Sequence, residues 1–174
     1  MFLLLDIGGT NIRLASSSDG NSISSVKIIP TPPNFIDGIK VLEELSSQII
    51  NGEKIQAVSI GITGILNPDK NQLVKSPHLP NWTNQEVKQQ LEKLFNAPVF
   101  LENDTALVGL GEAIKGAGQG FSIVAYITVS TGLGGVRIVE ISEFEERILV
   151  NFFSLATLIS KSPCLEFNPT IIPV

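Results

Sequence analysis

A pair of adjacent glycines lies near the start of the chain, between two apolar runs. The string consists of Asp6, Ile7, Gly8, Gly9, Thr10 and Asn11. Adjacent glycines let a backbone approach a phosphate closely, and the hydroxyl and amide that follow can donate hydrogen bonds to it. Asp6 could hold the water shell of a Mg²⁺ ion at the end of a strand. A plain hairpin turn is the structural alternative, so the other motifs must decide.

A second candidate is the string Leu101-Glu102-Asn103-Asp104, where the pattern predicts that a strand ends and a helix begins. Catalytic groups in α/β sheets usually lie at such junctions. Asn103 can both donate to and accept from a sugar hydroxyl, and Asp104 can act as a general base toward an attacking hydroxyl. Asn and Asp are also common helix caps, which is the structural alternative.

A second glycine-rich turn repeats the logic of the first. It consists of Ser130, Thr131, Gly132, Leu133, Gly134 and Gly135. Its amides and its threonine hydroxyl could bind a nucleotide phosphate, although alone it is a weak signal. Two glycine hairpins and an acidic strand end together favour phosphoryl transfer, in which catalysis is mostly positioning and charge neutralisation.

The elements that must position these residues follow from the apolar pattern. It predicts the order βββαβαβα, followed by a strand, a glycine turn and another strand, as if a second, similar lobe begins. The predicted strands are 2–7, 12–15, 23–29, 57–62, 98–101, 121–129 and 136–141, and the predicted helices are 35–50, 85–95 and 105–115. Residues 63–84 carry three prolines and predict a long, partly ordered loop, a length that usually signals a binding loop or a lid.

Composition excludes several classes of function. The chain of 174 residues has a net charge of −5 and no run of Lys or Arg, which argues against nucleic-acid binding. The single cysteine, Cys164, cannot form an internal disulfide, and the start of the chain has no basic leader, so we expect a cytoplasmic protein. The most apolar stretch, 148–159, is shorter than the ~20 residues of a membrane span, so we expect no membrane association.

The composition of the chain changes near residue 140, because none of its 15 glycines lies beyond Gly135. Apolar residues then recur at helical spacing, and Ser142 with Glu145 forms a capping-box start. This pattern predicts an amphipathic helix over about 141–160. Prolines beyond it predict an irregular end.

Read in order, the motifs resemble the sugar-kinase branch of the ROK family, within the actin-like ATPase superfamily. The matching strings are LLLDIGGTNIRLA, GITGILNP, LPNW, PVFLENDTALVGLGEA and YITVSTGLGG, which span about residues 1–139. The resemblance implies an α/β fold of the actin-like ATPase (ribonuclease H-like) type. It divides the chain into an N-terminal kinase lobe (1–119), the first hairpin of a second lobe (120–140) and an atypical helical tail (141–174).

The resemblance also implies roles for individual residues. Asp104 would be the base that deprotonates the sugar hydroxyl, Asn103 a sugar ligand, and Gly64 with Thr63 would line the sugar pocket. ATP would be held by two phosphate turns, formed by Gly8, Gly9, Thr10 and Asn11 and by Thr131, Gly132 and Gly134. Asp6 would lie near Mg²⁺.

The function implied is ATP-dependent phosphorylation of a hexose hydroxyl, of glucokinase type. The chain starts directly on its first strand, without the DNA-binding domain of the family's repressors, which favours a kinase. The Glu-x-Gly-His sugar segment and the cysteine-rich zinc cluster of the family's second lobe do not occur in the sequence, so we expect little activity from this chain alone. The alternatives are a non-catalytic remnant that binds sugar or a partner, and one half of a split kinase that needs a second-lobe chain. The amphipathic tail could also form a homodimer seam.

Three further residues have a structural interpretation beside a functional one. Trp82 could stack on a sugar or anchor its loop on the core. Arg13 could neutralise phosphate charge or lie on the surface of a strand. His78 is expected to be a solvated loop residue.

Overall fold

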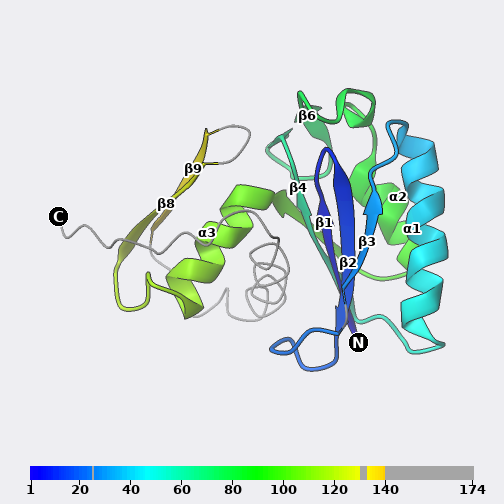
Figure 1. Ribbon diagram of the computed structural model, residues 1–174, viewed down its shortest axis with the longest axis horizontal. Coiled ribbons are helices and arrows are strands. Elements are labelled where there is room, and N and C mark those ends of the chain that lie inside the picture. The colour runs from blue at the N-terminus through cyan, green and yellow to red at the C-terminus, as the bar shows by residue number, and fades with distance from the viewer. Residues whose placement is uncertain (25, 130–132, 140–174) are drawn as a thin grey trace.

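A five-stranded mixed sheet forms the centre of the protein in the computed structural model, which describes residues 1–24, 26–129 and 133–139 (Figure 1). Its strands, in their order across the sheet, are β3 (Lys27–Pro30), β2 (Asn11–Ser17), β1 (Phe2–Ile7), β4 (Ala57–Ile62) and β7 (Val99–Asn103). The pairs β1–β2 and β2–β3 are antiparallel, whereas β1–β4 and β4–β7 are parallel. The C-terminal ends of β1, β4 and β7 therefore lie side by side along one edge of the sheet.

Two helices, α1 (Phe35–Ile50) and α2 (Val87–Phe95), pack on the same side of this sheet (Figure 1). The main core consists largely of apolar side chains from β1, β2, β4, β6, β7 and these two helices, with Trp82 from the segment between β6 and α2. Asn34 caps the start of helix α1, and its side chain accepts a hydrogen bond of 2.8 Å from the Ile36 amide. The helix ends at Asn51 in the left-handed conformation, which Asn adopts more readily than most residues. The predicted helix boundaries are thus explained by local capping.

The segment between β4 and α2 is more ordered than the sequence predicted. It contains strands β5 (Ile65–Leu66) and β6 (Leu73–Lys75) and a short 3₁₀ turn, η1 (Pro80–Trp82). Trp82 is fully buried, meets the Phe35 ring edge-on at 5.2 Å, and donates a hydrogen bond of 3.1 Å to the Pro32 carbonyl. Of the two interpretations of Trp82, the structure supports the anchor.

Helix α3 (Asp104–Lys115) and the hairpin of β8 (Ile123–Val129) and β9 (Leu133–Val139) lie to one side of the sheet (Figure 1). A side chain at Gly109 of α3 would clash with Val136 and Tyr126, so this glycine lets the hairpin approach the helix. The opposite face of the hairpin is open: Ile127 is 68% exposed and Val129 is 60% exposed.

The predicted order βββαβαβα with a following hairpin is confirmed, apart from the added strands β5 and β6. Two predicted strands are shifted. The last, predicted at 136–141, is β9 (Leu133–Val139), so Leu133, Gly134 and Gly135 of the predicted glycine turn are paired with β8. The predicted strand 23–29 begins only at Lys27, because Ser16 and Ser24 bond each other through backbone and side-chain atoms and hold a turn there. The amphipathic helix predicted at 141–160, with the rest of the tail, lies outside the described residues. Within the described ranges, no helix is both long and apolar enough to span a membrane.

Candidate active site

The candidate site lies at the sheet edge where β1, β4 and β7 end. Ile62 pairs with Ile7 on one side and with Asn103 on the other. The Thr63 amide also donates to the Ile7 carbonyl at 3.1 Å, which extends the contact one residue past the strands. The first glycine turn, Thr63 and Asp104 therefore follow directly on three neighbouring strand ends.

The first glycine turn is a tight hairpin between β1 and β2. The Gly8 amide donates to the Asn11 carbonyl at 3.0 Å, and the Thr31 hydroxyl donates to the Gly8 carbonyl at 2.7 Å. Gly9 and Thr10 are exposed at the tip, where a ligand can reach them. A side chain at Gly9 would clash with His78, so the segment containing this exposed histidine packs directly on the turn.

Asp6 is buried below the turn and forms an ion pair with Arg13. The Arg13 Nη1 atom lies 2.7 Å from Asp6 Oδ2, and Asp6 is only 4% exposed. Burial raises the pKa of Asp6, the Arg13 hydrogen bond and charge oppose that rise, and the negative charge of Asp104 adds to it. Arg13 is thus an ion-pair partner of the Asp6 carboxylate, in addition to any contact with a phosphate. Two mutually repelling carboxylates are a donor set that fits Mg²⁺, which usually takes one or two carboxylates and several waters.

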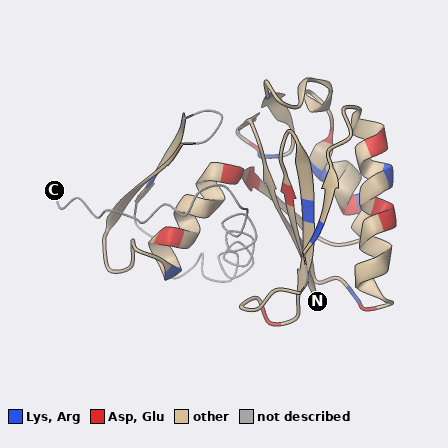
Figure 2. Ribbon diagram, in the orientation of Figure 1, with Lys and Arg blue, Asp and Glu red and all other residues tan. Residues whose placement is uncertain are grey.

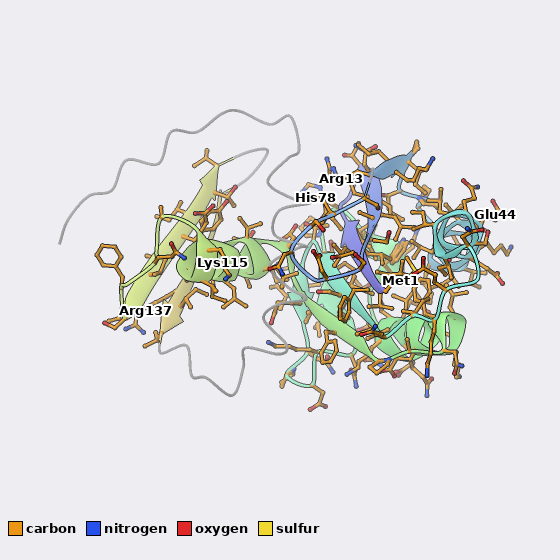
Figure 3. The ribbon with its side chains drawn as sticks, turned by 90° about the horizontal axis from the view of Figure 1, so that it is seen from below. Met1, Arg13, Glu44, His78, Lys115 and Arg137 are labelled. Atoms are coloured by element: carbon orange, nitrogen blue, oxygen red, sulfur yellow. The ribbon has the colours of Figure 1, made fainter. Side chains whose placement is uncertain are left out.

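Acidic positions gather at this edge, at the ends of β1 and β7 and the start of α3 (Figure 2). Arg137 lies on the hairpin, well away from Arg13 (Figure 3). No group of three or more potential metal ligands of the His, Cys, Asp or Glu type occurs in the described part of the chain.

Asn103 ties the start of α3 to the loop that follows β4. Its Oδ1 accepts from the Ala106 amide at 3.1 Å, and its Nδ2 donates to the Gly64 carbonyl at 2.9 Å. The helix-cap interpretation of Asn103 is thus confirmed, while an amide nitrogen carries a second hydrogen that can serve a ligand. Gly64 has a φ of +130°, and a Cβ there would lie 2.6 Å from the Lys75 carbonyl. Glycine is required at this position for both reasons.

Asp104 is the first residue of α3 and is partly buried. Its Oδ1 accepts from the Thr105 amide at 2.7 Å and from the Thr105 hydroxyl at 3.3 Å. A carboxylate at a helix N-terminus is also stabilised by the helix dipole. The arrangement holds the Asp104 carboxyl group at the sheet edge.

The second glycine turn reaches the site through Gly134. A Cβ at Gly134 would lie 3.0 Å from the Thr105 hydroxyl oxygen, so the start of β9 packs against the residue after Asp104. Thr131 and Gly132 lie outside the described residues.

The structure adds an ion pair that the sequence analysis missed. Lys70, at the tip of the β5–β6 hairpin, pairs with Glu102 at the end of β7. Glu102 also accepts from the Asn103 amide at 2.9 Å. The only sequence signal was the position of Glu102 beside Asn103 and Asp104, because the apolar pattern does not say which loop crosses the strand end.

Comparison with known proteins gives a family match over most of the chain. A family model described as the ROK family matches residues 3–142. A glucokinase from Streptomyces coelicolor is 33% identical over 134 residues, which is 75% of this chain and 41% of that protein. A xylose repressor from Bacillus spizizenii is 32% identical over 77 residues, which is 44% of this chain and 20% of that protein.

Among solved structures, a ROK family glucokinase from Streptomyces griseus in complex with glucose and AMPPNP is similar to this chain. The TM-score is 0.69 at 31% sequence identity, over 79% of this chain and 44% of the glucokinase. The chain therefore spans less than half the length of the glucokinases that it matches.

Proposed function

The chain belongs to the ROK family, and from that premise we propose that it supplies the base and the first phosphate turn of an ATP-dependent hexose kinase. Its central mixed sheet matches the actin-like ATPase fold of ROK kinases. The observation that supports the proposal best is the meeting of the first glycine turn and Asp104 at one sheet edge. A purely structural turn and a purely structural helix cap would not need to be neighbours.

In the proposed mechanism, Asp104 accepts the proton of the attacking sugar hydroxyl through its carboxylate. Asn103 holds the sugar with the amide hydrogen that it does not share with Gly64, and Thr63 with Gly64 lines the same pocket. General-base catalysis of this kind contributes about 10²–10⁴-fold in rate. The remaining acceleration comes from holding both reactants in line.

The phosphates of ATP are assigned to the two glycine turns. Gly8, Gly9, Thr10 and Asn11 would hold them from the sheet, and Thr131, Gly132 and Gly134 from the hairpin. The glucokinase structure with AMPPNP supports the use of ATP. Asp6 would hold Mg²⁺ through its water shell, and the bound ion would neutralise charge on the transferred phosphate. We place the reaction in the cytoplasm, where ATP and hexoses are both available.

A kinetic and calorimetric comparison tests this function. In a form of the kinase made active by a complete second lobe, supplied with Mg-ATP and a panel of hexoses, we expect Asp104→Asn to lower kcat at least 100-fold, because the amide cannot take a proton. The KM for sugar should change less than threefold. Asp37→Asn is the matched control, because Asp37 is an exposed aspartate on α1. Equal turnover of wild type and Asp104→Asn would remove Asp104 from the role of base.

Calorimetry of the wild type separates the alternatives. Binding heat with a hexose but no turnover would fit a kinase half or a remnant that binds sugar, and co-purification of a second-lobe chain would identify the kinase half. Neither heat nor turnover would support a non-catalytic remnant.

A further inference from the structure

Thr105 contacts both the proposed base and the second glycine strand. Its amide and its hydroxyl donate to the same carboxylate oxygen, Asp104 Oδ1, at 2.7 and 3.3 Å. On its other side, its hydroxyl and methyl groups pack against the backbone of Gly134, where a Cβ would come within 3.0 Å of the hydroxyl oxygen. The partly buried Thr105 side chain therefore lies between the two.

We propose that Thr105 is a positioning residue for Asp104. Its hydroxyl holds Oδ1 in the protein and leaves Oδ2 as the oxygen that receives the proton of the sugar hydroxyl. This inference rests on the proposed function of Asp104. Thr105 itself exchanges no proton with the substrate.

The need for such a residue follows from the freedom of an aspartate at the start of a helix. The last torsion of an Asp side chain is broad, so a single hydrogen bond leaves the carboxylate plane poorly defined. A second donor on the same oxygen defines that plane, and the Gly134 backbone prevents the donor from turning away. A displacement of about 1 Å in a reacting group can cost on the order of 100-fold in rate, so a fixed carboxylate has kinetic value.

Variants of Thr105 separate the hydroxyl from the packing. Thr105→Val keeps the branched shape and removes the hydroxyl, and Thr105→Ser does the reverse. We expect Thr105→Val to lower kcat about tenfold with the KM for sugar within twofold, and Thr105→Ser to stay within threefold of wild type in both. Thr105→Ala, which lacks the hydroxyl without adding a methyl group in its place, should show the same loss as Thr105→Val. Wild-type turnover in Thr105→Val, or an equal loss in Thr105→Ser, would overturn the proposal.

A second measurement does not depend on turnover. Three-bond NMR couplings from the Asp104 carboxyl carbon to its own backbone nitrogen and carbonyl carbon report the χ1 rotamer, which must be single if the carboxylate plane is to be fixed. We expect one rotamer in the wild type and Thr105→Ser, and averaged couplings in Thr105→Val and Thr105→Ala. Averaged couplings in the wild type would overturn the proposal even in an active kinase. A single rotamer with neither turnover nor sugar heat would instead refute the proposed function and leave the positioning role intact.

Discussion

Asp6 and Asp104 are two carboxylates at one sheet edge in different environments. Asp6 is buried and forms an ion pair with Arg13, whereas Asp104 is partly buried and accepts hydrogen bonds from Thr105. Burial and the negative charge of Asp104 raise the pKa of Asp6, and the Arg13 guanidinium offsets only part of that rise. Different environments give two carboxylates different roles, as acid–base sites often require. The proposed roles use this difference: Asp6 stays paired with Arg13 below the turn, and Asp104 is the group proposed to meet the substrate.

Asp19 provides a pH-dependent test at the scale of one residue. Its carboxylate accepts from the Ser22 and Asn21 amides at 2.9 Å each and from two serine hydroxyls. These hydrogen bonds, with the Ser22 and Asn21 amides contributing most, lower the pKa of Asp19 well below its ordinary 3.8. A carboxyl group whose pKa is lower in the folded state stabilises the fold above its unfolded pKa, and this contribution is lost as the pH falls toward the folded pKa.

We therefore expect Asp19→Ala to lower the urea midpoint at pH 7, with Asp19→Asn in between because its amide oxygen still accepts. The deficit of Asp19→Ala should shrink as the pH falls below 3.8, where the unfolded chain becomes protonated. Urea titrations from pH 7 to the acid limit, with the exposed Asp37→Ala as control, measure this. A deficit that is the same at every pH would contradict the assignment.

At the scale of elements, Gly38 and Trp82 show how a helix admits a distant loop. A Cβ at Gly38 would clash with the Trp82 ring. The absence of a side chain at Gly38 therefore lets η1 pack closely against α1. We expect Gly38→Ala to destabilise the protein by about 1–3 kcal/mol, the usual cost of overpacking, despite a helix propensity gain of about 1 kcal/mol. Trp82 is the only tryptophan, so its fluorescence should also shift to longer wavelength in the folded variant.

Urea denaturation followed by tryptophan fluorescence measures both effects. Ser47→Ala, at an exposed position of the same helix, should leave stability and emission nearly unchanged. A Gly38→Ala variant as stable as Ser47→Ala, with unshifted emission, would mean that Trp82 does not need this space.

The same elements show how far the sequence predicted the structure. Helices and strands were predictable because each has its own apolar period and caps, and the sheet-edge residues were predictable because parallel strands end together. The regular structure within residues 63–84 was not predictable. Trp82 of this segment packs into the space that Gly38 leaves on α1, and the sequence does not show that these two positions meet. The Lys70–Glu102 and Asp6–Arg13 pairs were not predicted either. Both pairs depend on which loops and strands become neighbours, and a charge beside a motif does not specify its partner.

At the scale of the whole molecule, the chain divides into a well-packed sheet and a lightly supported hairpin. Among the described residues, the main core contains side chains from β1, β2, β4, β6, β7, α1 and α2, but none from β8 or β9. The hairpin has α3 on one face and exposed Ile123, Ile127 and Val129 on the other. Segments with few buried contacts open locally at a lower free energy than the core.

We expect hydrogen exchange to reveal this hierarchy, with amides of β8 and β9 exchanging at least tenfold faster than those of β1 and β4. Gly109→Ala should accelerate exchange in the hairpin by a further factor of about ten, or about 1.4 kcal/mol, because the new side chain would clash with Val136 and Tyr126. Exchange in β1 and β4 should change less than twofold. Uniform acceleration across both parts would instead mean that the hairpin and the sheet unfold as one unit. If only the hairpin responds, its opening withdraws Gly134 from Thr105 while the first glycine turn and Asp104 stay in place, so the two halves of the proposed phosphate site differ in stability.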